Sequence, residues 1–173
     1  ALADILAGDV NPSGRLPYTY PKYEQGLITY DHKPGQNMEG KMEGAYDYGA
    51  QTSVQYPFGF GLSYTTFEYS DLVVENKEFV SGDTIRISVD VKNTGTASGK
   101  GTVMLFSRDM IATLSPDVRR LRAFEKISLN PGEIKTISLT VPADDLAYVN
   151  EKGKWVLEAG EFMLQTGNLT EKI

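Results

Sequence analysis

Three acidic residues in the N-terminal half stand four positions apart, a spacing that would place their carboxylates on one face of a helix. They are Glu39, Glu43 and Asp47. Carboxylates held together in this way can act as general acids and bases. Glycines at positions 40, 44 and 49 interrupt the stretch, and each costs a helix about 1 kcal/mol relative to alanine. We therefore expect a solvated loop, with the edge of a binding site as the alternative.

Ser13 stands between a proline and a glycine, so it could suggest an exposed nucleophile. A nucleophile elbow needs glycine two residues before and two residues after the serine, on a turn from a strand into a helix. Here residues 1–8 have the apolar spacing of a helix, and Gly8 is a plausible C-cap. The order is therefore helix before strand, and we interpret residues 8–17 as a structural turn.

The aromatic and glycine-rich segment 56–67 is the densest motif in the chain. Gly59 and Gly61 permit positive φ and close backbone approach, but a phosphate-binding loop would have to open a helix and, in a P-loop, would carry a lysine. This segment reads as extended and contains no lysine. We predict an inter-domain packing hinge anchored by alternating apolar residues, namely Phe58, Phe60, Leu62 and Tyr64.

The remaining polar candidates lack suitable partners. His32 is the only histidine and cysteine is absent, so no metal-ligand spacing exists. Asp144 and Asp145 follow a proline, which is typical of the first turn of a short helix. Asn168 opens an Asn-Leu-Thr glycosylation sequon, which is a short motif. The sequence therefore predicts no catalytic, cofactor-binding or metal-binding residue.

The composition of the 173 residues excludes several classes of protein. Charged residues make up 23% and hydrophobic residues 40%, which is typical of a folded domain. The net charge of −6 argues against a basic face that binds nucleic acid. No apolar run is long enough to span a bilayer, so we expect no membrane span.

Residues 67–173 alternate between apolar and polar side chains in short segments separated by turn signals. The clearest segment is 84–92, where Ile85, Ile87, Val89 and Val91 share one face. Further strands are predicted at 69–75, 102–107, 122–129, 135–141, 154–158 and 161–166. The last two would form a hairpin across Ala159 and Gly160. About seven strands of this kind are typical of an immunoglobulin or fibronectin type III-like β-sandwich.

The predicted core follows from these strands. Large apolar side chains that would face it are Ile85, Ile87, Val89, Val91, Leu105, Phe124, Leu139, Trp155 and Leu164. Trp155 is the only tryptophan, and its strand context favours the core over a sugar-stacking surface.

Residues 1–66 differ in composition from the rest. They hold eight of the ten tyrosines and only four valine or isoleucine residues, so we expect a mostly irregular arm. Leu2, Ile5 and Leu6 read as the last turns of a helix that begins elsewhere, as if the chain were part of a larger protein. The long segment 30–48 is predicted to be a functional or mobile loop.

Five blocks carry a family resemblance, in the expected order. The chain resembles the C-terminal end of glycoside hydrolase family 3 enzymes, the β-glucosidases and their relatives. The blocks "GDVNPSGRLPYTYP" and "YPFGFGLSYTTFEYS" look like that family's linker motifs. The blocks "RRLRAFEKISLNPGE", "ISLTVPADDLAYV" and "KWVLEAGEFMLQTG" are similar to its fibronectin type III-like domain.

The resemblance implies a division of the chain. Residues 1–66 would comprise the end of an α/β sandwich domain, to about residue 17, followed by a connecting arm, and residues 67–173 would be the fibronectin type III-like β-sandwich. The family's two catalytic carboxyl groups, an Asp nucleophile in a barrel and a Glu acid/base in the α/β domain, would lie upstream. The implied partners are those two domains, and the implied location is the periplasm or the cell exterior.

The resemblance also implies a role for the predicted loop at residues 30–48. In the resembling enzymes this connection runs near the α/β domain, so it is expected to border the substrate entrance and to tune substrate preference. The residues at its ends are Tyr30, Asp31, His32, Tyr46, Asp47 and Tyr48. Three functions stay open: a non-catalytic structural domain, a carbohydrate-binding module with oligosaccharide contact, and a protein-interaction module.

Overall fold

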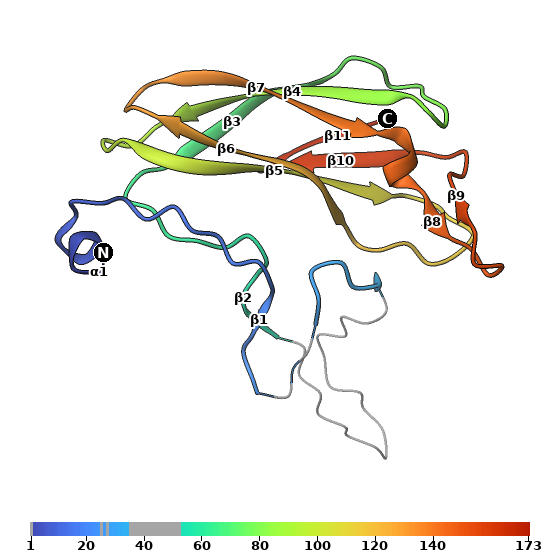
Figure 1. Cartoon of the computed structure of the whole chain (residues 1–173), viewed down its shortest axis with the longest axis horizontal. Helices are drawn as coiled ribbons and strands as arrows, with labels where there is room; N and C mark the ends of the chain where they lie inside the picture. Colours follow the sequence, from blue (N-terminus) through green and yellow to red (C-terminus); the bar gives the residue numbers. More distant parts are fainter. Residues whose placement is uncertain (1, 25, 27, 35–52) are drawn as a thin grey trace.

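The alternating C-terminal segments fold into two antiparallel sheets with one hydrophobic core between them (Figure 1). The structure is a computed structural model that describes residues 2–24, 26, 28–34 and 53–173. One sheet has the order β11-β10-β5-β6 and the other has the order β3-β4-β7. This is the predicted sandwich, and it is the dominant architecture of the described chain.

The strands of the first sheet are β5 (Gly99–Asp109), β6 (Arg120–Leu129), β10 (Phe162–Thr166) and β11 (Leu169–Lys172). Those of the second are β3 (Phe67–Val74), β4 (Thr84–Asn93) and β7 (Ile134–Pro142). A 3-10 turn, η2 (Ala143–Leu146), follows β7 and begins at the predicted Asp144–Asp145 segment. Two short strands, β8 (Tyr148–Val149) and β9 (Trp155–Val156), pair separately at one end of the sandwich (Figure 1).

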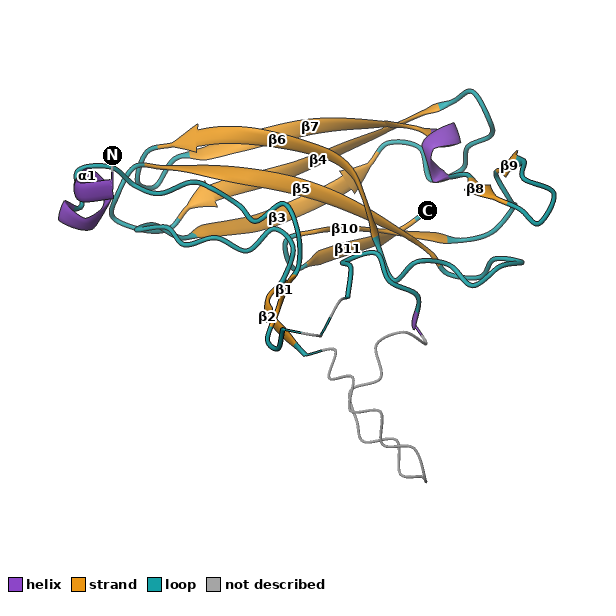
Figure 2. Ribbon diagram, turned by 60° about the horizontal axis from the view of Figure 1, so that its bottom comes forward, coloured by secondary structure: helices purple, strands orange, loops and turns teal. Residues whose placement is uncertain are grey.

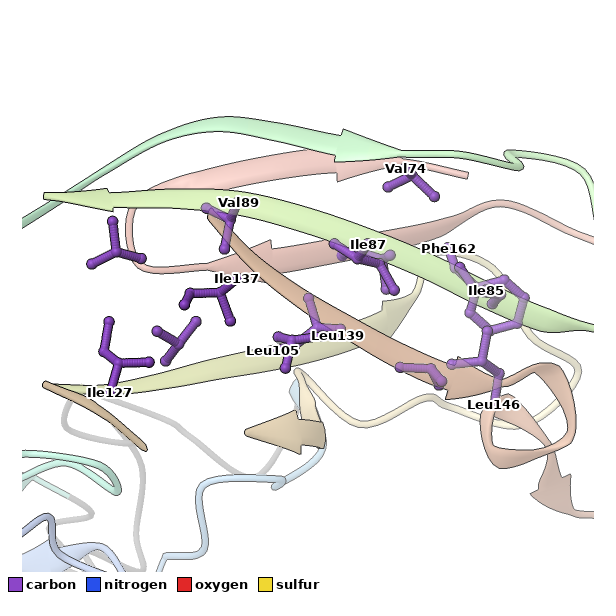
Figure 3. Close-up of a cluster of buried hydrophobic side chains, with 14 of the residues drawn as sticks. Val74, Ile85, Ile87, Val89, Leu105, Ile127, Ile137, Leu139, Leu146 and Phe162 are labelled. Carbon is purple, nitrogen blue, oxygen red and sulfur yellow. The ribbon is translucent and has the colours of Figure 1, made fainter. Parts of the chain in front are cut away.

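The core confirms the alternation read from residues 84–92. Ile85, Ile87, Val89 and Val91 are all buried, and β4 pairs with β7 so that Val89 stands opposite Ile137. Figure 3 shows Ile87 and Val89 on one side of this core and Leu105 and Ile127 of the facing sheet on the other. Leu139 and Leu164 are buried as predicted.

The prediction of a core position is wrong for two residues, because Phe124 is 67% exposed and Trp155 is 69% exposed. In β6, Ile127 and Leu129 face the core. Side chains alternate between the two faces along a strand. Phe124 is an odd number of positions from Ile127 and from Leu129, so its side chain points to the outer face. Trp155 lies in β9, which pairs only with β8 outside the sandwich and has no core neighbours to cover the ring.

The predicted hairpin across Ala159 and Gly160 is also wrong. β9 pairs with β8, whereas β10 pairs with β5 and β11. The real hairpin turns at Gly167, whose φ of 55° is a conformation that glycine adopts most easily. β11 was missed because its four residues carry little apolar alternation.

The arm begins with α1 (Leu2–Ala7), which ends at Gly8 as predicted. Gly8 has a φ of 87°, and the Asp9 amide donates to the Asp4 carbonyl at 2.9 Å, a left-handed C-cap. Farther on, β1 (Tyr20–Pro21) pairs with β2 (Val54–Tyr56) in a two-stranded ribbon (Figure 2). The described residues of the arm are therefore mostly irregular, in agreement with its composition.

Candidate functional site

The two glycine-containing motifs of the arm lie against each other, although they are far apart in sequence. The Leu16 amide donates to the Phe60 carbonyl at 2.8 Å, and the Gly59 amide donates to the Leu16 carbonyl at 2.9 Å. The Arg15 guanidinium donates to the Gly61 carbonyl at 2.7 Å. Residues 14–16 and 59–61 thus form one hydrogen-bonded unit, which we call the clasp.

Asn11 joins the clasp to the sandwich. Its side-chain oxygen accepts from the Ser63 hydroxyl at 3.0 Å and the Tyr64 amide at 2.9 Å, while its amide nitrogen donates to the Ser98 carbonyl at 3.0 Å. The Tyr64 hydroxyl in turn donates to the Ile5 carbonyl at 2.6 Å. One asparagine therefore connects the segment after α1, the glycine-rich motif and the turn that precedes β5.

Asn93 anchors the end of the arm inside the sandwich. Its side chain is fully buried, and its oxygen accepts from the Thr65 hydroxyl at 2.5 Å and the Gly95 amide at 3.1 Å. Its amide nitrogen donates to the carbonyls of Ala97 and Leu129 at 2.9 and 3.1 Å. All the hydrogen-bonding capacity of this buried amide is used, as a buried polar group requires.

An aromatic cluster holds the arm on the outer face of β5. The rings of Tyr30 and Phe58 stack with centroids 4.2 Å apart, and each meets Phe106 edge-on at 6.2 Å. The Arg119 guanidinium lies 4.8 Å from the centroid of the Phe106 ring, within cation–π range. Phe58 therefore packs on the sandwich.

The other hinge residues behave differently. Phe60 is half-buried against Tyr56 of the arm, with ring centroids 4.8 Å apart. Leu62 is 72% exposed, and Tyr64 is half-exposed. With so much of its side chain open to solvent, Leu62 does not pack on the sandwich. Their role between domains stays a prediction.

The predicted entrance loop is described only at its start. Tyr30 stacks in the aromatic cluster, and the Val118 amide donates to the His32 carbonyl at 2.9 Å. The His32 ring nitrogen Nδ1 lies 2.7 Å from the Thr29 carbonyl oxygen. Asp31 is half-buried. The start of the loop is thus held against the sandwich.

The second half of that loop lies outside the described residues. It includes Tyr46, Asp47 and Tyr48, together with the carboxylates at Glu39 and Glu43. Its role at a substrate entrance therefore stays a prediction.

α1 has most of its apolar surface uncovered by the described chain. None of its residues is buried, and Leu2 and Leu6 are 71% and 76% exposed. An apolar helix stripe left open to water is typical of an interface. The nearest support is the Tyr64 hydroxyl on the Ile5 carbonyl, which orients the helix without covering it.

A hollow that sequence reasoning missed lies at the other end of the sandwich. It measures about 340 Å³ and lies between β5, β6, η2 and the β8–β9 hairpin, with Trp155 and Tyr148 in its lining. A second hollow of about 310 Å³ shares Arg120, Arg122 and Trp155 with it. The only sequence signal was the lone tryptophan, which the strand pattern assigned to the core.

The charges in this hollow are arranged around Asp117 and Arg122. Asp117 accepts salt bridges from Lys33 at 2.7 Å and Arg120 at 2.6 Å. Arg122 donates through Nε to the Ser107 hydroxyl at 2.7 Å and through a terminal nitrogen to the Asp145 carbonyl. Burial, followed by repulsion from Arg120, lowers the pKa of the Arg122 guanidinium.

Tyr148 and Glu158 form a hydrogen-bonded pair beside the hollow. The Tyr148 hydroxyl donates to Glu158 at 2.5 Å, and the Thr113 amide donates to the other carboxylate oxygen at 2.9 Å. Hydrogen bonds from Thr113 and then Tyr148 lower the pKa of Glu158. Burial raises the pKa of nearby Asp109. The pair ties β8 to the segment before β10.

Among the described residues, no group of three or more His, Asp or Glu side chains is placed to hold a metal ion. The single α-helix in the described part of the chain is too short to cross a bilayer.

Two family profiles match the chain. Residues 1–64 match the glycosyl hydrolase family 3 C-terminal domain, and residues 101–170 match a fibronectin type III-like domain. The chain is 40% identical to thermostable β-glucosidase B of Acetivibrio thermocellus, covering 100% of this chain and 24% of that protein. It is 36% identical to the periplasmic β-glucosidase of Salmonella typhimurium, over 96% of this chain and 22% of that protein.

Solved structures of β-glucosidases contain a region with the same fold as this chain. A β-glucosidase from Erythrobacter marinus has a TM-score of 0.87 at 34% identity, covering 99% of this chain and 23% of that one. A β-glucosidase from Listeria innocua in complex with glucose has a TM-score of 0.84 at 28% identity, covering 99% and 25%. The chain thus spans about a quarter of the length of the proteins it matches.

Proposed function

The chain belongs to glycoside hydrolase family 3, whose C-terminal region it matches, and from that premise we propose that it is the non-catalytic structural end of a β-glucosidase-like enzyme. The parent enzyme would hydrolyse O-glycosidic bonds with retention. That reaction needs two carboxyl groups about 5 Å apart, and we assign both to the part of the enzyme that this chain does not span.

The uncovered apolar stripe of α1 carries this proposal. Leu2 and Leu6 are largely exposed, and no described segment of the chain packs on them. Burying a leucine side chain contributes about 1.5–3 kcal/mol, so a surface that covers both residues gains substantial binding energy. We assign that surface to the α/β domain of the parent enzyme, with the barrel domain as the second partner.

The clasp and the buried asparagine support the same proposal. A structural domain can brace its neighbour only if the connection between them is stiff. The arm of this chain is held by hydrogen bonds through Asn11 and Asn93 and by the stacked rings of Tyr30 and Phe58. The sandwich would therefore hold the arm, and through it α1, in a defined position against the parent.

We assign the parent to the periplasm or the cell exterior, which the periplasmic β-glucosidase among its relatives supports. The loop at 30–48 would tune substrate preference from its place beside the α/β domain. Its described start is held against the sandwich through Tyr30 and His32.

A chimera tests the structural role. The upstream part of the Acetivibrio thermocellus β-glucosidase B would be expressed alone and joined to this chain, which is 40% identical to its own C-terminal end. We expect the truncated enzyme to lose stability and β-glucosidase activity, and the joined chain to restore both. A truncated enzyme as stable and active as the intact one would overturn the proposal.

A paired variant locates the effect. Leu2→Asp combined with Leu6→Asp should abolish the restoration while leaving the melting temperature of the isolated chain unchanged, because neither residue packs on the sandwich. The matched control is Val80→Asp, which alters another exposed apolar residue, away from α1. If the control impairs the chimera equally, the contact is not made by α1.

A further inference from the structure

The two ends of the sandwich carry different surfaces. α1 and its exposed leucines lie at one end, and the β8–β9 hairpin with its adjoining hollows lies at the other (Figures 1 and 2). The hollows are therefore remote from the surface that we assign to the α/β domain of the parent enzyme. Any ligand that they accept is independent of the structural role proposed above.

Trp155 provides a flat apolar surface in this hollow. It lines both adjoining hollows and is 69% exposed, so one indole ring borders two connected spaces. A tryptophan ring combines a large apolar face with one polar N–H group. The C–H faces of a pyranose ring pack on such an aromatic face, while the hydroxyl groups around the ring point away from it.

Arg122 supplies a directional donor next to that platform. Its guanidinium is half-buried and is oriented by the Ser107 hydroxyl and the Asp145 carbonyl. No carboxylate in residues 2–24, 26, 28–34 or 53–173 forms a salt bridge with it. A guanidinium has five N–H donors, so Arg122 retains donors for the oxygen atoms of a ligand.

The hollows as a whole are close to electrically balanced. The cationic side chains in their lining are Lys33, Arg120 and Arg122, and the acidic ones are Asp109, Asp117, Asp144 and Asp145. Sugar hydroxyl groups both donate and accept, so they match a lining of mixed sign. A strongly charged ligand would meet repulsion from one set or the other. The combination favours a neutral saccharide.

We propose that these hollows bind a neutral oligosaccharide, with one pyranose ring stacked on Trp155 and its hydroxyl groups on Arg122 and the neighbouring carboxylates. Each hollow, at about 340 and 310 Å³, falls within the range of ligand sites. This site would retain an oligosaccharide chain on the enzyme.

Intrinsic fluorescence gives a direct test, because Trp155 is the only tryptophan in the chain. The full chain would be titrated with cellotetraose, xylotetraose and tetragalacturonic acid, with calorimetry as the second measurement. We expect a shift of the Trp155 emission and saturable binding with at least one neutral probe. Binding of the acidic probe alone would overturn the neutral assignment, and binding of none would overturn the site.

Four variants locate the binding. Trp155→Ala should weaken it about tenfold, whereas Trp155→Phe should retain part of it through the remaining ring. Arg122→Met should also weaken it. Phe124→Ala removes an equally exposed aromatic ring on the outer face of β6 and should leave the affinity within about twofold. Equal effects of Trp155→Ala and Phe124→Ala would show general aromatic adhesion and contradict the site.

The result of the oligosaccharide titration can be distinguished from the result of the chimera experiment. Trp155→Ala should leave chimera stability unchanged, and the α1 substitutions should leave oligosaccharide affinity unchanged. Loss of one property without the other distinguishes a failure of this site from a failure of the structural role.

Discussion

Gly61 lies so close to Gly14 that a Cβ atom on Gly61 would stand 2.2 Å from the Gly14 carbonyl oxygen. The Arg15 side chain closes the same space, at 2.9 Å from that Cβ position. The two motifs of the arm can therefore meet only if position 61 has no side chain. This contact makes two segments from opposite ends of the arm into one structural unit.

Gly61→Ala should destabilise the clasp, because the atom it would strike is backbone and cannot rotate away. Overpacking of this kind costs about 1–3 kcal/mol. The measurement is a thermal melt together with limited proteolysis of the arm. Gly14→Ala is the matched control, since a Cβ atom there meets nothing within 4 Å. Equal sensitivity of both variants would show that the close approach does not govern stability.

Asn93→Ala should be among the most destabilising polar substitutions in the chain. It removes four hydrogen bonds and leaves the Leu129 carbonyl and the Thr65 hydroxyl without their partners in a buried region. We expect a loss of about 2–4 kcal/mol in the free energy of unfolding, measured by urea denaturation. Asn130→Ala, at an exposed turn, should change it by no more than about 0.5 kcal/mol.

The two aromatic residues outside the core should tolerate truncation. Phe124→Ala and Trp155→Ala should each change the free energy of unfolding by about 0.5 kcal/mol or less, because both side chains are largely exposed. Leu105→Ala and Leu164→Ala, which empty fully buried positions, should cost about 2–5 kcal/mol. A large loss from either aromatic truncation would indicate that the outer surfaces contribute to the core.

The link between Tyr148 and Glu158 should weaken in acid. Hydrogen bonds lower the folded-state pKa of Glu158 below its ordinary value of 4.5. A group with a depressed pKa stabilises the fold above its unfolded-state pKa, and that contribution is lost as the pH falls through the folded-state pKa. An NMR titration of the Glu158 carboxyl carbon should therefore show a midpoint below 4.5.

Tyr148→Phe provides the control for this titration. The midpoint should rise but stay below the ordinary value, because the hydrogen bonds from Thr113 lower the pKa more than the one from Tyr148 does. A midpoint at or above 4.5 in the unaltered protein would contradict the hydrogen-bonded arrangement. Glu158→Gln removes the titrating carboxyl group, so the stability that this contact contributes should no longer depend on pH in the acid range.

Local sequence patterns predicted where the strands of the sandwich lie better than they predicted which strands pair. The alternation at 84–92 and the turn signals around it were sufficient for β4, because a strand with one buried face must alternate with period two. The same rule, applied from Ile127 and Leu129, would have placed Phe124 on the outer face. A large aromatic side chain can thus lie on the outer face of a strand whose smaller apolar neighbours form the core.

Strand pairing could not be read in the same way. Residues 154–166 contain two apolar runs with a glycine between them, which favours a hairpin locally. The fold instead forms two other local hairpins, which pair Trp155 with Val149 and Leu164 with Glu171, and it places Leu164 opposite Ser107 in the large sheet. The long-range pairing of β10 with β5 depends on the assembled sheet, and it decides on which side of β10 a local hairpin can form.

The amino-acid order was therefore enough to establish the sandwich class, the irregular arm, the α1 stop at Gly8 and the family resemblance. These features depend on neighbouring residues, through side-chain alternation, turn chemistry and motif identity. The clasp between Gly14 and Gly61, the anchoring of the arm on Asn93 and the exposure of Trp155 beside Arg122 required the folded chain. Each of them joins residues distant in sequence, and only packing of the whole molecule decides which distant surfaces meet.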